Sequence, residues 1–119
     1  MMKTSILNLF FILSLTAYSV YGQQIDVFGP TGSPQTYTVP PCTETISVVL
    51  SGAGGGGPNG GLGAVLDLTV PVQPGDEITI VVGETATGVP GGYPNGGNGQ
   101  TANNTGNASF GGGGSSMIY

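Results

Sequence analysis

Apolar and polar residues alternate along three stretches of the chain, residues 45–51, 64–72 and 77–82. A two-residue period places every second side chain on the same face, which is typical of β-strands with one face in a core. Each stretch therefore predicts a strand with one apolar face. The three apolar faces are formed by Ile46, Val48 and Leu50, by Leu66, Leu68 and Val70, and by Ile78, Ile80 and Val82.

Two shorter stretches also favour extended structure. Residues 35–39 predict a short strand that ends at Pro40 and Pro41, and residues 25–28 predict an edge strand. Glycine and proline recur too often after residue 22 for a long helical period. One-face patterning favours antiparallel sheets with a solvated side. We therefore expect an all-β fold, a small antiparallel β-sandwich that resembles a jelly roll.

Residues 72–76 predict the turn between the last two long strands. Pro74 presets the φ of the first central turn position, and Gly75 accepts the positive φ that the next position requires. We expect this turn to join residues 64–72 and 77–82 as an antiparallel hairpin.

Glycine is concentrated in the second part of the chain, where 21 of the 24 glycines lie at or after Gly52. The sequence PNGGLG at residues 58–63 recurs as PNGGNG at residues 94–99. Glycine-rich composition is also typical of flexible linkers. The first copy, however, joins two strands that should share a core, so we expect ordered loops. The strict three-residue glycine period of collagen is absent.

The first 22 residues are typical of an export signal. Lys3 provides the charged start, and residues 6–15 form a short apolar core that is too short to span a bilayer. Cleavage after Gly22 would leave a secreted or cell-surface chain whose single glycine-rich β-domain covers residues 23–119. A retained membrane anchor is the alternative for residues 1–22.

Charge excludes several function classes. Lys3 is the only cationic side chain, the chain has no His, and it carries six carboxylates. Nucleic acids and anionic lipid surfaces are recognised largely through Lys and Arg, so neither is an expected partner. The residues that commonly act as bases and oxyanion clamps are also missing, so we expect no enzyme and no cofactor. Calcium, which takes oxygen ligands, is the one metal that this composition leaves open.

A dinucleotide-type G-x-G-x-x-G occurs at residues 52–57, directly after a predicted strand. That fingerprint requires a helix to begin at the third glycine, so that backbone amides face the pyrophosphate. Pro58 and a further predicted strand follow instead. We therefore reject a nucleotide site.

Four side chains are candidates for chemistry or contact. Cys42 is unpaired, and a buried thiol, a free thiol and a disulfide to a cysteine elsewhere all remain open. Tyr93 is a candidate contact for a glycan or a protein surface, with a buried ring that packs on the sheet as the alternative. Asn95 and Asn98, in the second copy of the repeat, are the other candidate ligand contacts.

The order of these motifs resembles a glycine-rich β-domain family. It runs through QTYTVP at 35–40, ISVVLSGAGGGG at 46–57, GLGAV at 61–65, VQPGDEITIVVG at 72–83 and FGGGGS at 110–115. The family occurs in exported bacterial surface proteins and is similar to phage tail adhesins and to the glycine-rich extracellular region of anaplastic lymphoma kinase and leukocyte tyrosine kinase receptors. The resemblance implies an antiparallel sandwich with bundled polyglycine helices, and binding or adhesion without catalysis.

One departure from the family pattern concerns the terminal glycine run. Members commonly follow it with a small residue, an acidic residue and an Arg, whereas this chain reads SSMIY at 115–119. The resemblance therefore predicts a domain truncated at its C-terminus.

The leading functional expectation is a secreted or cell-surface adhesion, binding or structural module that contacts an extracellular protein or glycan surface. A self-associating matrix or fibre component is the second hypothesis, because strand edges can pair between chains. An ice-binding glycine-rich surface and a carboxylate-only hydrolase are the remaining alternatives.

Overall fold

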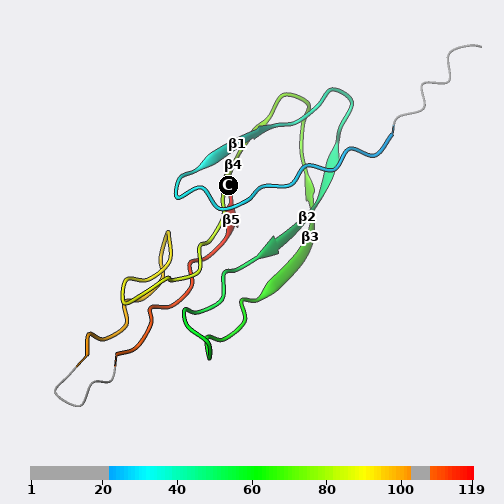
Figure 1. The fold of residues 1–119 in the computed structure, drawn as a ribbon. Helices are drawn as coiled ribbons and strands as arrows, with labels where there is room; N and C mark the ends of the chain where they lie inside the picture. The colour runs from blue at the N-terminus through cyan, green and yellow to red at the C-terminus, as the bar shows by residue number, and fades with distance from the viewer. Residues whose placement is uncertain (1–21, 103–107) are drawn as a thin grey trace, which may run out of the picture.

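The computed structural model describes residues 22–102 and 108–119, so the predicted export signal lies outside the described residues apart from Gly22. The described part contains five β-strands and no helix, which confirms the all-β prediction (Figure 1). It accordingly contains no helix able to cross a membrane. The strands are β1 (Gln35–Thr38), β2 (Thr45–Ser51), β3 (Val65–Pro71), β4 (Glu77–Val81) and β5 (Met117–Ile118).

The strands form two antiparallel sheets. One sheet has three strands in the order β1-β4-β5, and the other contains β2 and β3. The predicted bounds of β2 are confirmed, and those of β1, β3 and β4 are each within one residue. The two-residue strand β5 was not predicted, because its short sequence follows a glycine run and has no alternation to detect.

β2 and β3 form a hairpin in which Ile46 faces Val70, Val48 faces Leu68 and Leu50 faces Leu66. Burial along β2 alternates as predicted, with Ile46, Val48 and Leu50 half-buried and the residues between them exposed, Val49 included. Leu66 was predicted to face the core, but its side chain remains 57% exposed near the glycine loop.

β4 lies between β1 and β5, and both faces of this strand are covered. Ile80 and Val81 point to opposite faces and retain only 9% and 3% exposure. The one-face prediction for this strand therefore missed Val81. Among the residues that the structure describes, the buried apolar side chains are few: Val39, Ile80, Val81 and Ala86.

The turn at residues 72–76 has the predicted local geometry, but it does not form the predicted hairpin. Gly75 adopts φ +87°, and the Asp76 N–H donates to the Gln73 carbonyl at 3.1 Å. No hairpin forms here, because β3 pairs with β2 and β4 pairs with β1. A turn fixes where the chain reverses but not which strand each arm pairs with, so this turn links the two sheets.

The predicted edge strand at residues 25–28 does not form, since these residues join no ladder. The segment is extended but lacks a pairing partner, and Ile25 and Val27 are 76% and 89% exposed. Phe28 alone is anchored, with its ring edge-on to Tyr37 of β1 at a centroid distance of 6.1 Å.

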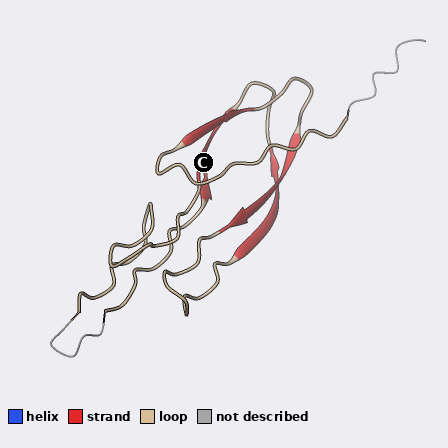
Figure 2. Cartoon of the chain, in the orientation of Figure 1, coloured by secondary structure: helices blue, strands red, loops and turns tan. Residues whose placement is uncertain are grey.

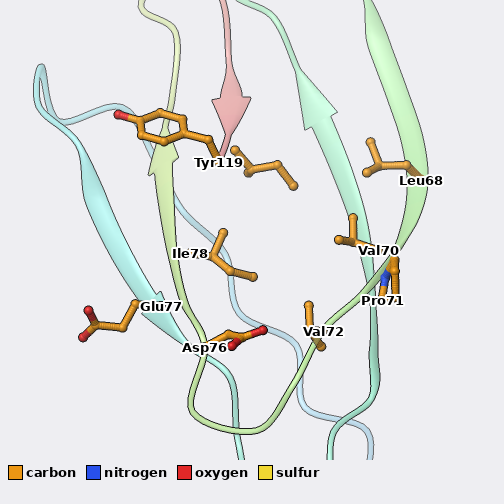
Figure 3. Close-up of a pocket in the computed structure, with 9 residues that line it drawn as sticks. Leu68, Val70, Pro71, Val72, Asp76, Glu77, Ile78 and Tyr119 are labelled. Atoms are coloured by element: carbon orange, nitrogen blue, oxygen red, sulfur yellow. The ribbon is translucent and has the colours of Figure 1, made fainter.

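An apolar groove of about 470 Å³ opens between the two sheets (Figure 3). Leu68 and Val70 of β3 line one wall, and Ile78 of β4 and Ile118 of β5 line the other. Pro71, Val72 and Asp76 close its end at the turn. The apolar faces of the sheets therefore do not meet in a filled core at this point.

Candidate functional site

The largest ordered feature outside the strands is a set of glycine-rich segments that we call the glycine bundle. It comprises residues 52–57, 60–64, 83–99 and 110–114. These loops extend away from the end of the molecule where the strands lie (Figure 2). The bundle follows directly from the strands, because β2 leads into its first segment, β4 leads into the third, and the fourth leads into β5.

Residues 111–114 form the hub of this bundle. Gly111 and Gly112 donate to the carbonyls of Gly88 and Gly97, and Gly114 donates to Glu84 at 2.9 Å. In return, the hub accepts hydrogen bonds from Ala53 to Gly114, from Gly56 to Gly111 and from Gly92 to Gly112. The hub is therefore hydrogen-bonded to the segments 52–57 and 83–99 through backbone groups alone.

Most glycines of the bundle are required because neighbouring backbone lies too close for a Cβ atom, and not because their φ is positive. Among the glycines in the described ranges, only Gly32, Gly57 and Gly75 have a positive φ in the left-handed region. By contrast, a Cβ at Gly92 would overlap the Glu84 carbonyl, and one at Gly114 would overlap the Tyr93 carbonyl. The missing side chain is what allows backbone to pack on backbone here.

The two copies of the repeat have equivalent packing. Gly60 and Gly96 are the first glycines of the two copies. A Cβ added at Gly60 would overlap backbone atoms of Gly55, and one added at Gly96 would overlap the Gly112 carbonyl. The next glycines, Gly61 and Gly97, have nothing within 4 Å of such an atom. The third glycines of the copies are crowded again, Gly63 by Gly52 and Gly99 by Ser109.

The first and third glycines of each copy are crowded and the second is open. Each copy begins with a turn, in which the Gly60 N–H donates to the Gly57 carbonyl at 3.2 Å and the Gly96 N–H donates to the Gly92 carbonyl at 2.8 Å. The sequence repeat therefore specifies one face that packs on the bundle and another that faces outward. The equivalent packing also supports the ordered-loop interpretation of these segments over the flexible-linker one.

Ser116 ties the bundle to both sheets. Its hydroxyl donates to the Ser51 carbonyl at 2.7 Å, at the end of β2, and accepts from the Gly83 N–H at 2.9 Å, just beyond β4. Sequence reasoning missed this residue, because a serine after a glycine run is usually a solvated loop residue and carries no further signal.

The three predicted contact residues lie on the bundle. The Tyr93 side chain is half-buried, and its carbonyl accepts from Glu84 at 2.9 Å. Asn98 is exposed, and its Oδ1 accepts the Gly91 N–H at 3.0 Å. Asn95 is also exposed and donates a long 3.4 Å hydrogen bond to the Ser115 hydroxyl. The structure brings the three residues into one loop, and their role as ligand contacts stays a prediction.

Cys42 lies apart from this loop, in the turn between β1 and β2. Its thiol is free and exposed, and the residue has φ +63°, so the buried-thiol interpretation is wrong. An exposed thiol remains compatible with a disulfide to a cysteine in another chain.

The described residues offer no ready metal or nucleotide site. Within ranges 22–102 and 108–119, no three Cys, Asp or Glu side chains gather closely enough to hold a metal ion. After the G-x-G-x-x-G at residues 52–57 the backbone turns back through residues 58–64 into β3, and no helix opens there. The required arrangement of amides at a helix N-terminus is thus missing from this loop.

The glycine bundle is therefore the only extended surface in the described residues that combines an ordered backbone with the predicted contact residues. Glu84 is its one charged side chain, and its other hydrogen-bonding groups are neutral: backbone amides and carbonyls and Asn, Thr and Tyr side chains. Comparison of the chain with protein-family models, curated proteins and solved structures finds no match.

Proposed function

We propose that this protein is an exported, non-catalytic binding module that attaches to an extracellular protein or glycan surface through its glycine bundle. The observation that supports the proposal is the two-sided packing of the repeat. A Cβ added at Gly60 or Gly96 would overlap bundle backbone, whereas one at Gly61 or Gly97 would enter open space. The carbonyls of Gly61 and Gly97 nevertheless accept hydrogen bonds from Gly55 and Gly112, which hold the open face in place. The outward face of each copy therefore presents backbone that no side chain of its own covers.

A surface of this kind suits neutral, hydroxyl-rich or amide-rich partners. The six carboxylates and the single cation, Lys3, give the chain a formal net charge of −5, which disfavours anionic partners. Asn95 and Asn98 add amide groups that both donate and accept, and Tyr93 offers a ring that can stack on a sugar. Specificity would then come from the shape of the bundle and from the spacing of these groups.

Pre-organisation makes such binding energetically feasible despite the high glycine content. A free glycine chain would lose much conformational entropy on binding. In this bundle the loss occurs on folding, because hub hydrogen bonds and the Asn98-to-Gly91 contact already hold the loops. Ordering a surface before it meets its partner improves affinity mainly by lowering that entropic penalty.

The proposal is tested by screening the purified protein against arrays of neutral oligosaccharides and immobilised extracellular proteins. We expect a saturable partner whose affinity falls about tenfold in Tyr93→Leu, as for loss of one aromatic contact. Tyr119→Leu is the matched control, because Tyr119 is exposed but lies in the three-stranded sheet, where its backbone pairs with Thr79. Absence of any ligand in both arrays, together with a non-adherent protein, would refute the proposal.

A further inference from the structure

The glycine bundle contains a chemically labile sequence three times. The three Asn-Gly pairs are Asn59-Gly60, Asn95-Gly96 and Asn98-Gly99. Asparagine is thermolabile, because the backbone nitrogen of the next residue can attack its side-chain carbonyl carbon. A following glycine has no Cβ to shield that nitrogen. The sequence alone does not rank the three pairs, so any difference between them comes from the fold.

The fold restrains both reacting groups of the Asn98-Gly99 pair. The Asn98 Oδ1 accepts the Gly91 N–H at 3.0 Å, which holds the side chain. The Gly99 N–H donates to the Val89 carbonyl at 2.7 Å, which holds the attacking nitrogen. Two hydrogen bonds of ordinary length must therefore break before the Gly99 nitrogen can reach the Asn98 side chain.

The Asn95-Gly96 pair is restrained mainly at its nitrogen. The Gly96 N–H donates to the Gly92 carbonyl at 2.8 Å. The Asn95 side chain makes only the long 3.4 Å hydrogen bond to the Ser115 hydroxyl. This pair is therefore protected by one hydrogen bond of ordinary length and one weak one.

The Asn59-Gly60 pair is the least restrained of the three. Asn59 is exposed in the loop between β2 and β3 (Figure 1). Its side chain, unlike those of Asn95 and Asn98, makes no hydrogen bond with a residue that the structure describes. The Gly60 N–H donates to the Gly57 carbonyl at 3.2 Å, longer than the corresponding bonds of the other two pairs. A longer hydrogen bond is weaker, so the Gly60 nitrogen is the most easily released.

We propose that Asn59 is a site of spontaneous covalent modification in the folded protein, which converts it through a cyclic imide to aspartate and isoaspartate. The Gly60 nitrogen bonds to Cγ of Asn59, the Cγ–Nδ2 bond breaks, and the proton lost by Gly60 leaves with the side-chain nitrogen as ammonia. Water then opens the ring. Cleavage at Cγ gives aspartate, and cleavage at the main-chain carbonyl carbon gives isoaspartate. The sum consumes water, releases ammonia and requires no oxidant.

The modification alters one copy of the repeat and leaves the other intact. Each conversion adds a carboxylate to a chain whose formal net charge is −5. Isoaspartate also adds a methylene to the main chain directly before Gly60, where even a Cβ would overlap Gly55. The neighbouring hydrogen bond from the Gly55 N–H to the Gly61 carbonyl, at 2.9 Å, must then shift. The outward face of residues 58–63 therefore changes shape, while that of residues 94–99 is kept.

Peptide mapping of the full chain after incubation in mildly alkaline buffer tests the proposal. A Glu-specific protease separates the sites, because residues 45–77 contain Asn59 as their only asparagine and residues 85–119 contain the other two pairs. Mass spectrometry with peptide fragmentation then gives a rate for each asparagine. Each hydrogen bond that must open lowers the rate about fivefold. We expect Asn59 to convert at least about fivefold faster than Asn95 or Asn98.

Two controls separate the effect of the fold from that of the sequence. The three rates should converge in concentrated urea, where each Asn-Gly pair is released from its hydrogen bonds. Asn59→Gln should abolish the change in residues 45–77, because the longer side chain would have to close a larger ring.

Two outcomes would overturn the proposal. A rate at Asn59 in the folded protein that does not exceed the rates at Asn95 and Asn98 would show that exposure and a long hydrogen bond do not select the site. The same ratio of rates in folded and unfolded protein would show that local sequence, and not the fold, determines the order.

Discussion

The Gly114→Ala substitution adds one methyl group at the most crowded point of the hub. The three atoms nearest to the new Cβ are the Tyr93 carbonyl carbon and oxygen and the Pro94 nitrogen, all of them backbone. A backbone segment cannot rotate out of the way as a flexible side chain can. The hub or the segment around Tyr93 must therefore move.

The expected loss follows from what that movement breaks. The Gly114 N–H donates to the Glu84 carbonyl at 2.9 Å, and the Gly114 carbonyl accepts from Ala53 at 3.1 Å. Losing both hydrogen bonds costs about 2 kcal/mol, at about 1 kcal/mol each. Overpacking adds about 1–3 kcal/mol. Alanine restricts the unfolded chain and recovers about 0.4–1 kcal/mol, so we expect a net loss of about 3 kcal/mol.

Urea unfolding followed by far-ultraviolet circular dichroism measures this loss, since the chain has no Trp to report by fluorescence. Gly97→Ala is the matched control, because a Cβ there has no neighbour within 4 Å and φ is not positive. It should change stability by less than about 1 kcal/mol, in the stabilising direction. Equal stability of the two variants would refute the view that glycine is required wherever neighbouring backbone lies close to it.

Three further changes test the fold by the same urea assay. Ser116→Ala should lower the free energy of unfolding by about 1–3 kcal/mol, because it leaves the Gly83 N–H without its partner. The control Ser115→Ala should lower it by less than about 0.5 kcal/mol, and equal losses would contradict the bridging role of Ser116. Gly75→Ala should cost about 1–2 kcal/mol from positive φ alone, since no atom lies near the new Cβ, and a neutral result would contradict the turn geometry. Val81→Ala should cost about 2 kcal/mol and Val49→Ala less than about 0.5 kcal/mol, because only Val81 is buried; the reverse order would place the core elsewhere.

Local patterns in the sequence predict the strands well and their partners poorly. Residues 45–51 place Ile46, Val48 and Leu50 on one face, so the bounds of β2 follow from the pattern, although Val49 is an apolar residue on the exposed face. Residues 25–27 also alternate, and Phe28 follows them, yet residues 25–28 form no strand, because a strand also needs a neighbour, which local sequence does not specify. The turn at Gly75 illustrates the same limit, since its chemistry fixes φ while the β1–β4 pairing is decided by distant residues.

The candidate site was predicted only in outline. The repeat at residues 58–63 and 94–99 correctly indicates ordered loops, but sequence does not distinguish the central glycine run from the peripheral ones. Gly114 and Gly54 look alike in the sequence, yet Gly114 is buried in the hub and Gly54 is only half-buried. Their difference arises from three-dimensional neighbours, and the same holds for Ser116.

The position of the hub in the sequence has a consequence for how this chain folds. Residues 111–114 complete the bundle, and Ser116 closes a loop to Ser51 that is 65 residues long. Contacts of such sequence separation form slowly, because the entropy of loop closure precedes any gain from the contact. Until the hub docks, the segments at 52–57 and 83–99 lack most of their shared hydrogen bonds. The bundle should therefore behave as a single late cooperative unit, whose protection in hydrogen exchange appears in one step across both segments.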